Sequence, residues 1–560
     1  MIPILRIRNS NSFIKWNLQI AYVSTWSPLA TAFNTRPGRK LNLSLTQEDA
    51  GLFGIPELKS HEGFYAMKES AAWKTDALVA ESYSPNRLSD YNLESLQTFT
   101  LNTHRQLYSA LRSVVDSEDI FPTTPVDQHV ARLFLFDFEQ CGIHLPQMDR
   151  RRVVELNDSI LQLGQRFMAG AASPRALPKE SLPQNLRHFF SVDGNQVLVT
   201  GLYADSPNAM AREAAYRIFL YPDKHQEYLL TEMLTARHEL ACLCGFPTFS
   251  HRQVSSQSTG EIIQHCFRVI HETEGLLGHI YCDFYERPGK PNQDCHFTIR
   301  GGKEMADGSY QNPVVVLMLN LPPPRWSNPS LLTPGMVDNL FHEMGHAMHS
   351  MLARTRYQHV TGTRCTTDFA EVPSVLMEYF ASDPRVVRTF AKHFQTSESM
   401  PEDMLVRLCA SKHLFAASEM QVQVFYSALD QRYHGMHPLP GSTTDVLNEI
   451  QNKYYGIPCV PNTAWQLRFS HLVGYGAKYY SYLMSRAIAA WIWQTYFEAD
   501  PFNSSSGEKY RQECLAHGGG KPARELVAHF LGREVTSSNL VNSLINEINS
   551  KHEIIERLRH

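Results

Sequence analysis

The sequence predicts a mainly α-helical protein with one small β-sheet, and three observations support this fold class. From Leu43 to Arg252, apolar residues recur every three or four positions, which is the period of a helix that packs on one face. After about Gly260, short apolar runs alternate with Gly and Pro, which predicts strands. From Thr333 to the end of the chain, the helical period returns. We therefore expect a sheet within a mostly helical protein.

Proline and glycine divide the first part of the chain into separate elements. Val126–Cys141 and Arg150–Met168 show the helical period clearly, and prolines stand on either side of them. Within Phe189–Leu202, the pair Gly194-Asn195 separates two β-prone runs, which is typical of a tight hairpin. The expected order is therefore helices followed by a strand pair.

Three short strands are expected in the middle of the chain, namely Leu277–Tyr285, His296–Arg300 and Val314–Leu321. The apolar run Val314–Leu319 is far shorter than the ~20 residues that a membrane-spanning helix needs, so no membrane span is expected. We interpret this run as a strand. At the edge of the sheet, it would offer backbone hydrogen bonds to an extended peptide.

Charge and cysteine content disfavour several classes of protein. A net charge of −4, without a basic cluster beyond the N-terminal segment, argues against a nucleic-acid partner. The ten cysteines include no C-x-x-C pair, which predicts reduced thiols. The chain contains no G-x-S-x-G motif, which excludes a serine hydrolase built on a nucleophile elbow.

The N-terminal segment differs in composition from the rest of the chain. No acidic residue precedes Glu48, although Asp and Glu number 56 in 560 residues. The basic residues in the same stretch are Arg6, Arg8, Lys15, Arg36, Arg39 and Lys40. A basic, acid-free segment that contains serine is typical of a mitochondrial transit peptide, which we place at residues 1–38. A disordered basic tail is the alternative.

A metal-binding motif lies on the helix expected after Thr333-Pro334, which is a favourable helix start. His342-Glu343-Met-Gly-His346 has the form H-E-x-x-H. Two histidines four residues apart lie one turn above each other, so both imidazoles can bind one ion while Glu343 points beside it. This arrangement predicts a zinc site in which Glu343 acts on the attacking water.

The third ligand is expected to be a carboxylate from a following helix, which would complete the His₂Glu set of thermolysin-type zinc sites. The first acids after His346 are Asp368 and Glu371, which open a largely apolar helical stretch that reaches Glu378. Glu371 and Glu378 are two turns apart on one face, so one can bind zinc while the other orients a histidine. Either can be the ligand on spacing alone. Asp368 suits a helix cap or a hydrogen-bond partner.

These motifs resemble the thimet oligopeptidase and neurolysin family of zinc metallopeptidases. The resemblance is carried near the metal site by Phe341-His-Glu-Met-Gly-His-Ala-Met-His349, Gly362-Thr363 and Asp368-Phe-Ala-Glu371-Val-Pro-Ser374. Further along the chain it is carried by the Gly- and Tyr-rich segment His471–Tyr482, by His517–Gly520 and by Phe530–Arg533. It is strongest from about Glu274 to the end of the chain.

The resemblance implies roles for individual residues. In this family, the Glu of the F-x-E-x-P-S motif is the third zinc ligand, which selects Glu371 for one Zn²⁺ ion. Tyr482 and His471 match residues that contact the substrate or stabilise the oxyanion, and Tyr475 and Tyr479 belong to the same substrate-binding segment. On composition alone, a tyrosine cluster is more often core packing, so these roles follow from the resemblance only.

The resemblance also implies a fold and a substrate class. Family members are neurolysin-like zincins, in which two helical halves enclose a deep substrate channel and a small sheet lies near the zinc. We expect an N-terminal helical domain at residues 39–260 and a catalytic domain at 261–560. Together with the leader, the resemblance implies a monomeric zinc metalloendopeptidase of the mitochondrial matrix. Its substrates would be short or unfolded peptides, and it would remove an N-terminal octapeptide from imported precursor proteins.

The chain departs from the family in length. Family members carry a long further segment between stretches like Phe249–Arg252 and Glu274–Gly278, whereas here the junction is short. A second shortening lies between Ser82 and Leu101. The alternative function is therefore an inactive form that binds zinc or peptide without cleaving it.

Overall fold

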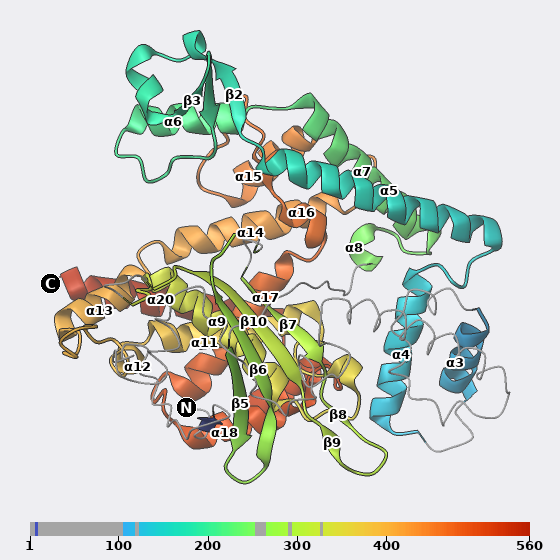
Figure 1. Cartoon of the computed structure of the whole chain (residues 1–560). Coiled ribbons are helices and arrows are strands. Elements are labelled where there is room, and N and C mark those ends of the chain that lie inside the picture. The colour runs from blue at the N-terminus through green and yellow to red at the C-terminus, as the bar shows by residue number, and fades with distance from the viewer. Residues whose placement is uncertain are drawn as a thin grey trace. The chain divides into compact units, whose positions relative to one another are not determined.

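The computed structural model describes residues 6–8, 105–117, 123–252, 265–288, 290, 294–324 and 329–559 (Figure 1). The chain folds into two units, and each draws on separate stretches of sequence. The first unit comprises the described residues of 1–136, 255–416 and 484–560, and the second comprises those of 137–254 and 417–483. Apart from Arg6–Arg8, the expected leader at residues 1–38 lies outside the described residues.

A five-stranded sheet lies in the first unit, with the order β1-β5-β6-β10-β7. Its strands are β1 (Arg6–Arg8), β5 (His265–His271), β6 (Gly275–Tyr285), β10 (Val314–Leu321) and β7 (Cys295–Arg300). The strands β6, β7 and β10 confirm the three that the sequence predicts. The strands β1 and β5 were not predicted.

The prediction that Val314–Leu319 forms an edge strand is wrong. β10 pairs in parallel with β6 and antiparallel with β7, so that Val315 lies opposite both Ile280 and Thr298. Nearly all of β10 is buried, and a continuous apolar run is the pattern of a strand covered on both faces. The outer strand at this end of the described sheet is β7.

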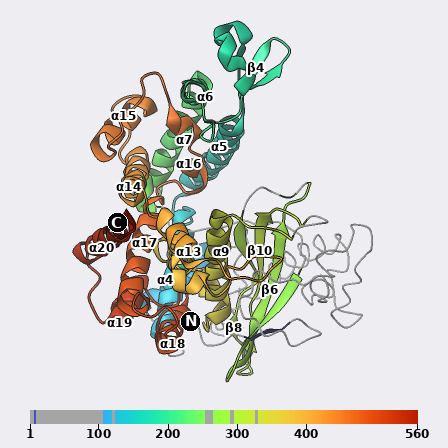
Figure 2. The ribbon, with the colours of Figure 1, turned by 90° about the vertical axis from the view of Figure 1, so that its left-hand side faces the viewer.

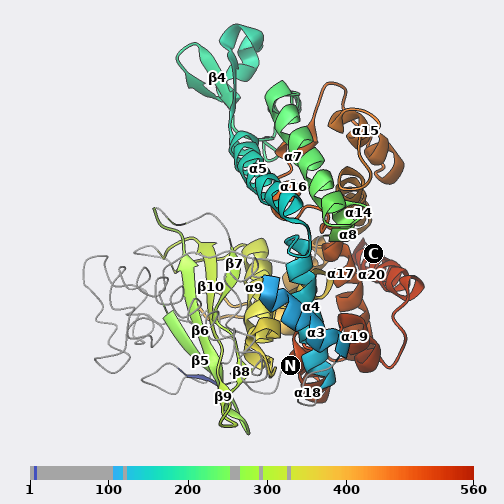
Figure 3. The ribbon, with the colours of Figure 1, turned by 90° about the vertical axis from the view of Figure 1, so that its right-hand side faces the viewer.

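The helix α9 (Pro334–Leu352) lies along the sheet beside β10 and carries the H-E-x-x-H motif (Figures 2 and 3). As predicted, it begins at Thr333-Pro334, where the Thr333 hydroxyl accepts a hydrogen bond from the Met336 backbone N–H. A capping side chain of this kind satisfies one of the N–H groups that a helix start leaves open. The position of both histidines therefore follows from a well-defined helix.

The helical stretch expected from Asp368 is divided into two helices, α10 (Thr367–Ala370) and α11 (Val372–Ser382). Glu371 stands at the junction between them. Asp368 does not cap the helix, because the N-cap residue of α10 is Thr366. The Asp368 carbonyl oxygen accepts a hydrogen bond from the Ser485 hydroxyl at 2.7 Å.

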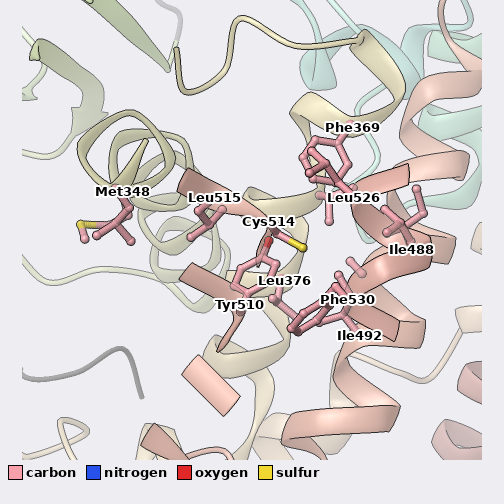
Figure 4. Packing of buried hydrophobic residues seen from close by; sticks show 14 of the residues in the cluster. Met348, Phe369, Leu376, Ile488, Ile492, Tyr510, Cys514, Leu515, Leu526 and Phe530 are labelled. Atoms are coloured by element: carbon pink, nitrogen blue, oxygen red, sulfur yellow. The ribbon is translucent and has the colours of Figure 1, made fainter. Parts of the chain in front are cut away.

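The largest hydrophobic core of the first unit joins the sheet, α9 and α11 to helices near the end of the chain. Figure 4 shows the helical part of this core. These helices are the later part of α17 (Tyr480–Ile492), α18 (Ser504–Glu513), α19 (Ala523–Leu531) and α20 (Ser537–Arg559). Phe369 and Phe530, both fully buried, belong to this core. Apolar burial of this extent is the main source of free energy that fixes α9 and α11 in place.

The second unit is built on two long helices, α5 (Gln147–Ala172) and α7 (Lys224–Leu243), which lie side by side (Figures 1 and 3). It also contains α14 (Ala416–Tyr433), α15 (Thr443–Tyr454), α16 (His471–Gly474) and the start of α17. A small antiparallel sheet has the order β2-β4-β3, with β2 (Arg175–Pro178), β4 (Gln196–Val199) and β3 (Ser191–Asp193). The predicted strand pair is confirmed as β3 and β4, whereas β2 was not predicted.

The remaining described α-helices and two short strands belong to the same two units. They are α3 (Arg105–Ser117), α4 (Pro125–Gln140), α6 (Ala209–Phe219), α8 (Phe249–Arg252), β8 (Lys303–Glu304), β9 (Tyr310–Gln311), α12 (Pro384–Val387) and α13 (Glu402–Ser411). The predicted mainly helical class with a small sheet near the H-E-x-x-H helix is confirmed. Within the described residues, no helix has the length and apolar character needed to cross a bilayer. All ten cysteines are described, and each is a free thiol.

Candidate active site

Two histidines and one glutamate converge at the α9–α11 contact. His342 and His346 are one turn apart on α9, with ring centroids 5.0 Å from each other. A single carboxylate oxygen, Glu371 Oε2, lies 3.3 Å from His342 Nε2 and 3.0 Å from His346 Nε2. The three candidate ligand atoms all lie within 4.8 Å of one another. The structure thus brings together the three residues that the sequence analysis selected.

Close packing of α9 against α11 places Glu371 within reach of the imidazoles. A Cβ atom on Gly345 would lie 2.6 Å from Ser374 Cα and 2.8 Å from the Pro373 carbonyl oxygen, so only glycine allows this approach. The buried Ser374 hydroxyl lies 3.0 Å from Glu371 Oε2 and donates a hydrogen bond to it. The contact between the helices therefore positions the carboxylate, and Ser374 orients it.

Glu378 meets only one of the two histidines. Its Oε1 atom lies 2.5 Å from His342 Nδ1, the ring nitrogen that faces away from Glu371. A carboxylate on the second ring nitrogen fixes the orientation of a histidine ligand and makes it more basic. Of the two acids that spacing left open, Glu371 is the one that contacts both imidazoles, and Glu378 supports His342 from behind.

The charges of the cluster suit a divalent cation. Burial alone would lower the pKa of His342, but hydrogen bonds with Glu371 and Glu378 raise it to about 10. Burial alone would raise the pKa of Glu371, but His346 and His342 hold it well below its usual range. His346 Nδ1 is buried without a hydrogen-bond partner in the described part of the chain. Two imidazole nitrogens and one carboxylate form a donor set that zinc binds, so the residues present fit this ion.

Glu343 lies between the two histidines on α9 and is only 7% exposed. Its Oε2 atom has no hydrogen-bond partner among the described residues. Burial raises the pKa of Glu343 above its ordinary value, while the neighbouring histidines act in the opposite direction. A buried carboxyl group with an open oxygen and a raised pKa is suited to accept a proton near neutral pH.

A half-buried histidine on the neighbouring strand was missed by the sequence analysis. His296 lies on β7, with its ring centroid 6.1 Å from that of His346 and its Nε2 atom 3.0 Å from the Ser350 hydroxyl. Burial lowers the pKa of His296 to about 3, so its ring is neutral. The strand itself was predicted, but no local pattern indicates which helix residue a strand side chain will face. His296 therefore places a neutral polar side chain beside the cluster.

The aromatic residues selected by resemblance lie together in the second unit. The rings of Tyr475 and Tyr482 are stacked at 5.5 Å, and Tyr479 lies 5.3 Å from both His471 and Tyr482. Tyr479 belongs to the hydrophobic core of this unit, and burial raises its pKa to about 12. Burial lowers the pKa of His471. The metal cluster belongs to the other unit, so the joint action of the two groups on one substrate stays a prediction.

Comparisons with known proteins agree on one family. The sequence profile of peptidase family M3 matches residues 263–544. The chain is 42% identical to the mitochondrial intermediate peptidase of Pongo abelii, over 98% of this chain and 96% of the relative. It is 42% identical to the enzyme of that name from Homo sapiens, over 95% of this chain and 94% of the relative. A protein of the same name from the fungus Malassezia globosa is 30% identical over 77% of this chain and 73% of the relative.

The lengths of these alignments bear on the short junction in this chain. The alignment with the Pongo abelii relative covers 687 positions, whereas this chain has 560 residues, so the relative contains internal residues that this chain lacks.

Among solved structures, PZ peptidase A with an inhibitor is similar at 14% identity, with a TM-score of 0.49 over 89% of this chain and 95% of that chain.

Proposed function

Since this chain belongs to peptidase family M3 and is a metallopeptidase, we propose that it hydrolyses peptide bonds with one Zn²⁺ ion held by His342, His346 and Glu371. The observation that carries this proposal is the position of Glu371 Oε2, which lies at 3.0 and 3.3 Å from imidazole nitrogens of two histidines four residues apart. This donor set is typical of catalytic zinc sites, which keep a further position open for water.

The residues of the chain have separate tasks in this mechanism. Bound zinc supplies Lewis-acid chemistry, which polarises the scissile carbonyl and acidifies a water molecule. Glu343 accepts the proton of the attacking water and then delivers it to the amine that leaves. Glu378 keeps His342 oriented, since it occupies the second ring nitrogen. Ser374 and the close helix contact at Gly345 hold Glu371 in place.

We assign substrate contacts to the aromatic cluster of the second unit. Tyr482 would donate a hydrogen bond to the developing oxyanion, with His471 as a second polar contact. Tyr475 and Tyr479 would contact the peptide. These assignments rest on the resemblance of His471–Tyr482 to the substrate segment of the thimet oligopeptidase and neurolysin family. The ring contacts of Tyr482 with Tyr475 and Tyr479 support a common surface.

The proposed substrates are imported mitochondrial precursor proteins, from which the enzyme removes an N-terminal octapeptide in the matrix. This part of the proposal is supported by the name of the relatives at 42% identity and by the acid-free composition of residues 1–38. A zinc- or peptide-binding protein without activity is the second candidate, which is favoured by the internal residues that the relatives have and this chain lacks.

The decisive experiment compares the wild-type protein with Glu343→Gln. Metal content is measured by mass spectrometry, and cleavage is measured with a quenched fluorescent peptide. We expect stoichiometric zinc in both proteins and a rate about 10² to 10⁴ times lower in the variant, because the water loses its proton acceptor. Zinc in both proteins with equal background cleavage would favour the inactive candidate. A precursor-derived peptide, with its cleavage position read by mass spectrometry, tests octapeptide removal.

A further inference from the structure

The segment of residues 472–479 runs from α16 to the residue before α17, and a network of three buried polar side chains holds it. Two of them, Asp430 and Arg237, bind its backbone. The three side chains are Arg237 on α7, Asp430 on α14 and His434 just after α14. They are 4%, 1% and 1% exposed, respectively. The tyrosines of the aromatic cluster lie on this segment or directly after it, so the network fixes the backbone from which their rings project.

Asp430 binds the backbone at two positions. Its Oδ1 atom accepts a hydrogen bond from the Ala477 N–H at 2.9 Å, and its Oδ2 atom accepts one from the Tyr479 N–H at 3.0 Å. Ala477 has a φ of 66°, in the left-handed region that is strained for a residue with a side chain. Hydrogen bonds to a buried carboxylate are strong enough to hold this conformation.

Arg237 holds the other end of the segment. Its guanidinium donates to the Leu472 carbonyl at 2.5 Å and to the Val473 carbonyl at 2.7 Å. It also lies 2.9 Å from His434 Nε2. Since Arg237 can only donate, His434 must accept at Nε2 and carry its proton on Nδ1. His434 Nδ1 donates a hydrogen bond to the Asp430 backbone carbonyl oxygen at 2.9 Å and lies 3.1 Å from Asp430 Oδ1, so the network runs from Arg237 through His434 to Asp430.

Within this segment, Gly476 packs closely against the side chains of Arg237 and His434. A Cβ atom on Gly476 would stand 2.5 Å from an Arg237 nitrogen and 2.8 Å from His434 Nε2. A larger residue would therefore push the backbone away from the buried side chains. Gly476 immediately follows Tyr475, whose ring stacks on Tyr482. A displaced backbone here would separate the stacked rings.

We propose that Asp430, together with Arg237 and His434, is a positioning network that preforms the aromatic surface which binds peptide substrates. An apolar core of similar volume would stabilise the fold at least as well as buried charges do. The charges also fix the conformation of the backbone, because Asp430 and Arg237 bind four specific backbone groups of this segment. The inference rests on the proposed role of the tyrosines in substrate binding.

The test uses peptide binding, which does not require turnover. Asp430→Asn is introduced in full-length Glu343→Gln protein, and affinity is measured by the anisotropy of a fluorescein-labelled version of the quenched peptide. The amide retains one acceptor and turns its NH₂ group toward the other backbone N–H, so one bond is lost. We expect affinity to fall about tenfold, since bonds to charged groups contribute about that much. Zinc content should not change. Asp205→Asn, an exposed change in the same unit, is the matched control.

Gly476→Ala provides a second variant that leaves the buried charges intact. It should also weaken peptide binding about tenfold, and it decides the question alone if circular dichroism shows that Asp430→Asn does not fold. When either variant is combined with Tyr482→Phe, the loss of peptide affinity in the double variant should be smaller than the product of the two single losses, because both changes act on one surface. Folded variants that bind peptide within about twofold of the parent, or losses that multiply, would overturn the inference. If the wild-type enzyme cleaves nothing while Asp430→Asn weakens binding, the proposed function fails and the positioning network stands.

Discussion

The metal cluster and the aromatic segment are held in place by different kinds of interaction. His342, His346 and Glu371 lie on or between helices that pack together at a glycine, and the polar contacts among them join residues fewer than thirty positions apart. The segment that carries Tyr475 is irregular, and its backbone is bound by Arg237 from 235 residues earlier in the chain.

This contrast predicts which changes should damage each region. Where two helices touch, added volume is costly and the ligands move with the helix axes. Where a buried charge holds an irregular segment, removal of the charge is costly, because the backbone groups it bound lose their partner. Added volume at the helix contact or substitution of a zinc ligand should therefore weaken metal binding. Replacement of Asp430 by an uncharged residue should instead weaken peptide binding.

The largest effect is expected from Glu371→Ala, which removes the ligand that joins the two histidines. The variant should hold less than about a tenth of the wild-type zinc and lose at least about 10³-fold in cleavage rate. Its affinity for the labelled peptide should change little, because the aromatic segment is held by other residues. Metal analysis and the anisotropy assay measure the two effects. An undiminished zinc content would show that Glu371 is not a zinc ligand. Glu525→Ala, an exposed change in the same unit, is the control.

A smaller loss of zinc is expected from Glu378→Gln. The amide keeps the size of the side chain but loses the charge that faces His342 Nδ1. Loss of such a partner typically weakens metal binding about 10- to 100-fold. Competition with a chromophoric zinc chelator gives the affinity. An unchanged value would show that Glu378 does not tune His342.

Gly345→Ala tests the helix contact without touching a polar group. The added Cβ atom meets the Ser374 backbone at 2.6 Å, so we expect the free energy of unfolding to fall by about 1–3 kcal/mol and zinc affinity to fall with it. Gly335→Ala is a matched control on the same helix, because its Cβ meets nothing within 4 Å. Denaturant unfolding should show that control to be neutral or up to about 1 kcal/mol more stable. Equal effects at both positions would contradict the packing argument.

The pH dependence of zinc affinity tests the charges of the cluster. In metal-free protein, the pKa of His342 is raised from 6.5 to about 10, because its hydrogen bonds to Glu371 and Glu378 outweigh burial. The stability that this proton provides is complete below pH 6.5 and is lost as the pH rises through about 10. Zinc must displace the proton, so affinity should rise about tenfold per pH unit within this window. Calorimetric titrations at pH 7 and 8 would show the slope, and a flat profile would contradict it.

Local periodicity accounts for most of what could be predicted about the fold. The helix that begins at Thr333-Pro334, the hairpin around Gly194-Asn195 and the strand Val314–Leu321 are confirmed, because each depends on residues close in sequence. The edge position expected for Val314–Leu319 is wrong, because a strand does not encode which strands pair with it. β5 was missed because its pattern is mixed, and pairing with β6 stabilises it.

The sequence by itself determined that His342 and His346 share one helix face with Glu343 between them, because the period of the α-helix fixes these positions. Only the tertiary structure decided that Glu371 contacts both imidazoles while Glu378 binds the back of His342. Only the tertiary structure also showed that Asp430 and Arg237 bind the backbone of the segment that carries Tyr475 and Tyr479. The physical reason is that these contacts depend on how helices and loops distant in sequence pack, and packing is decided by the whole core rather than by any local pattern.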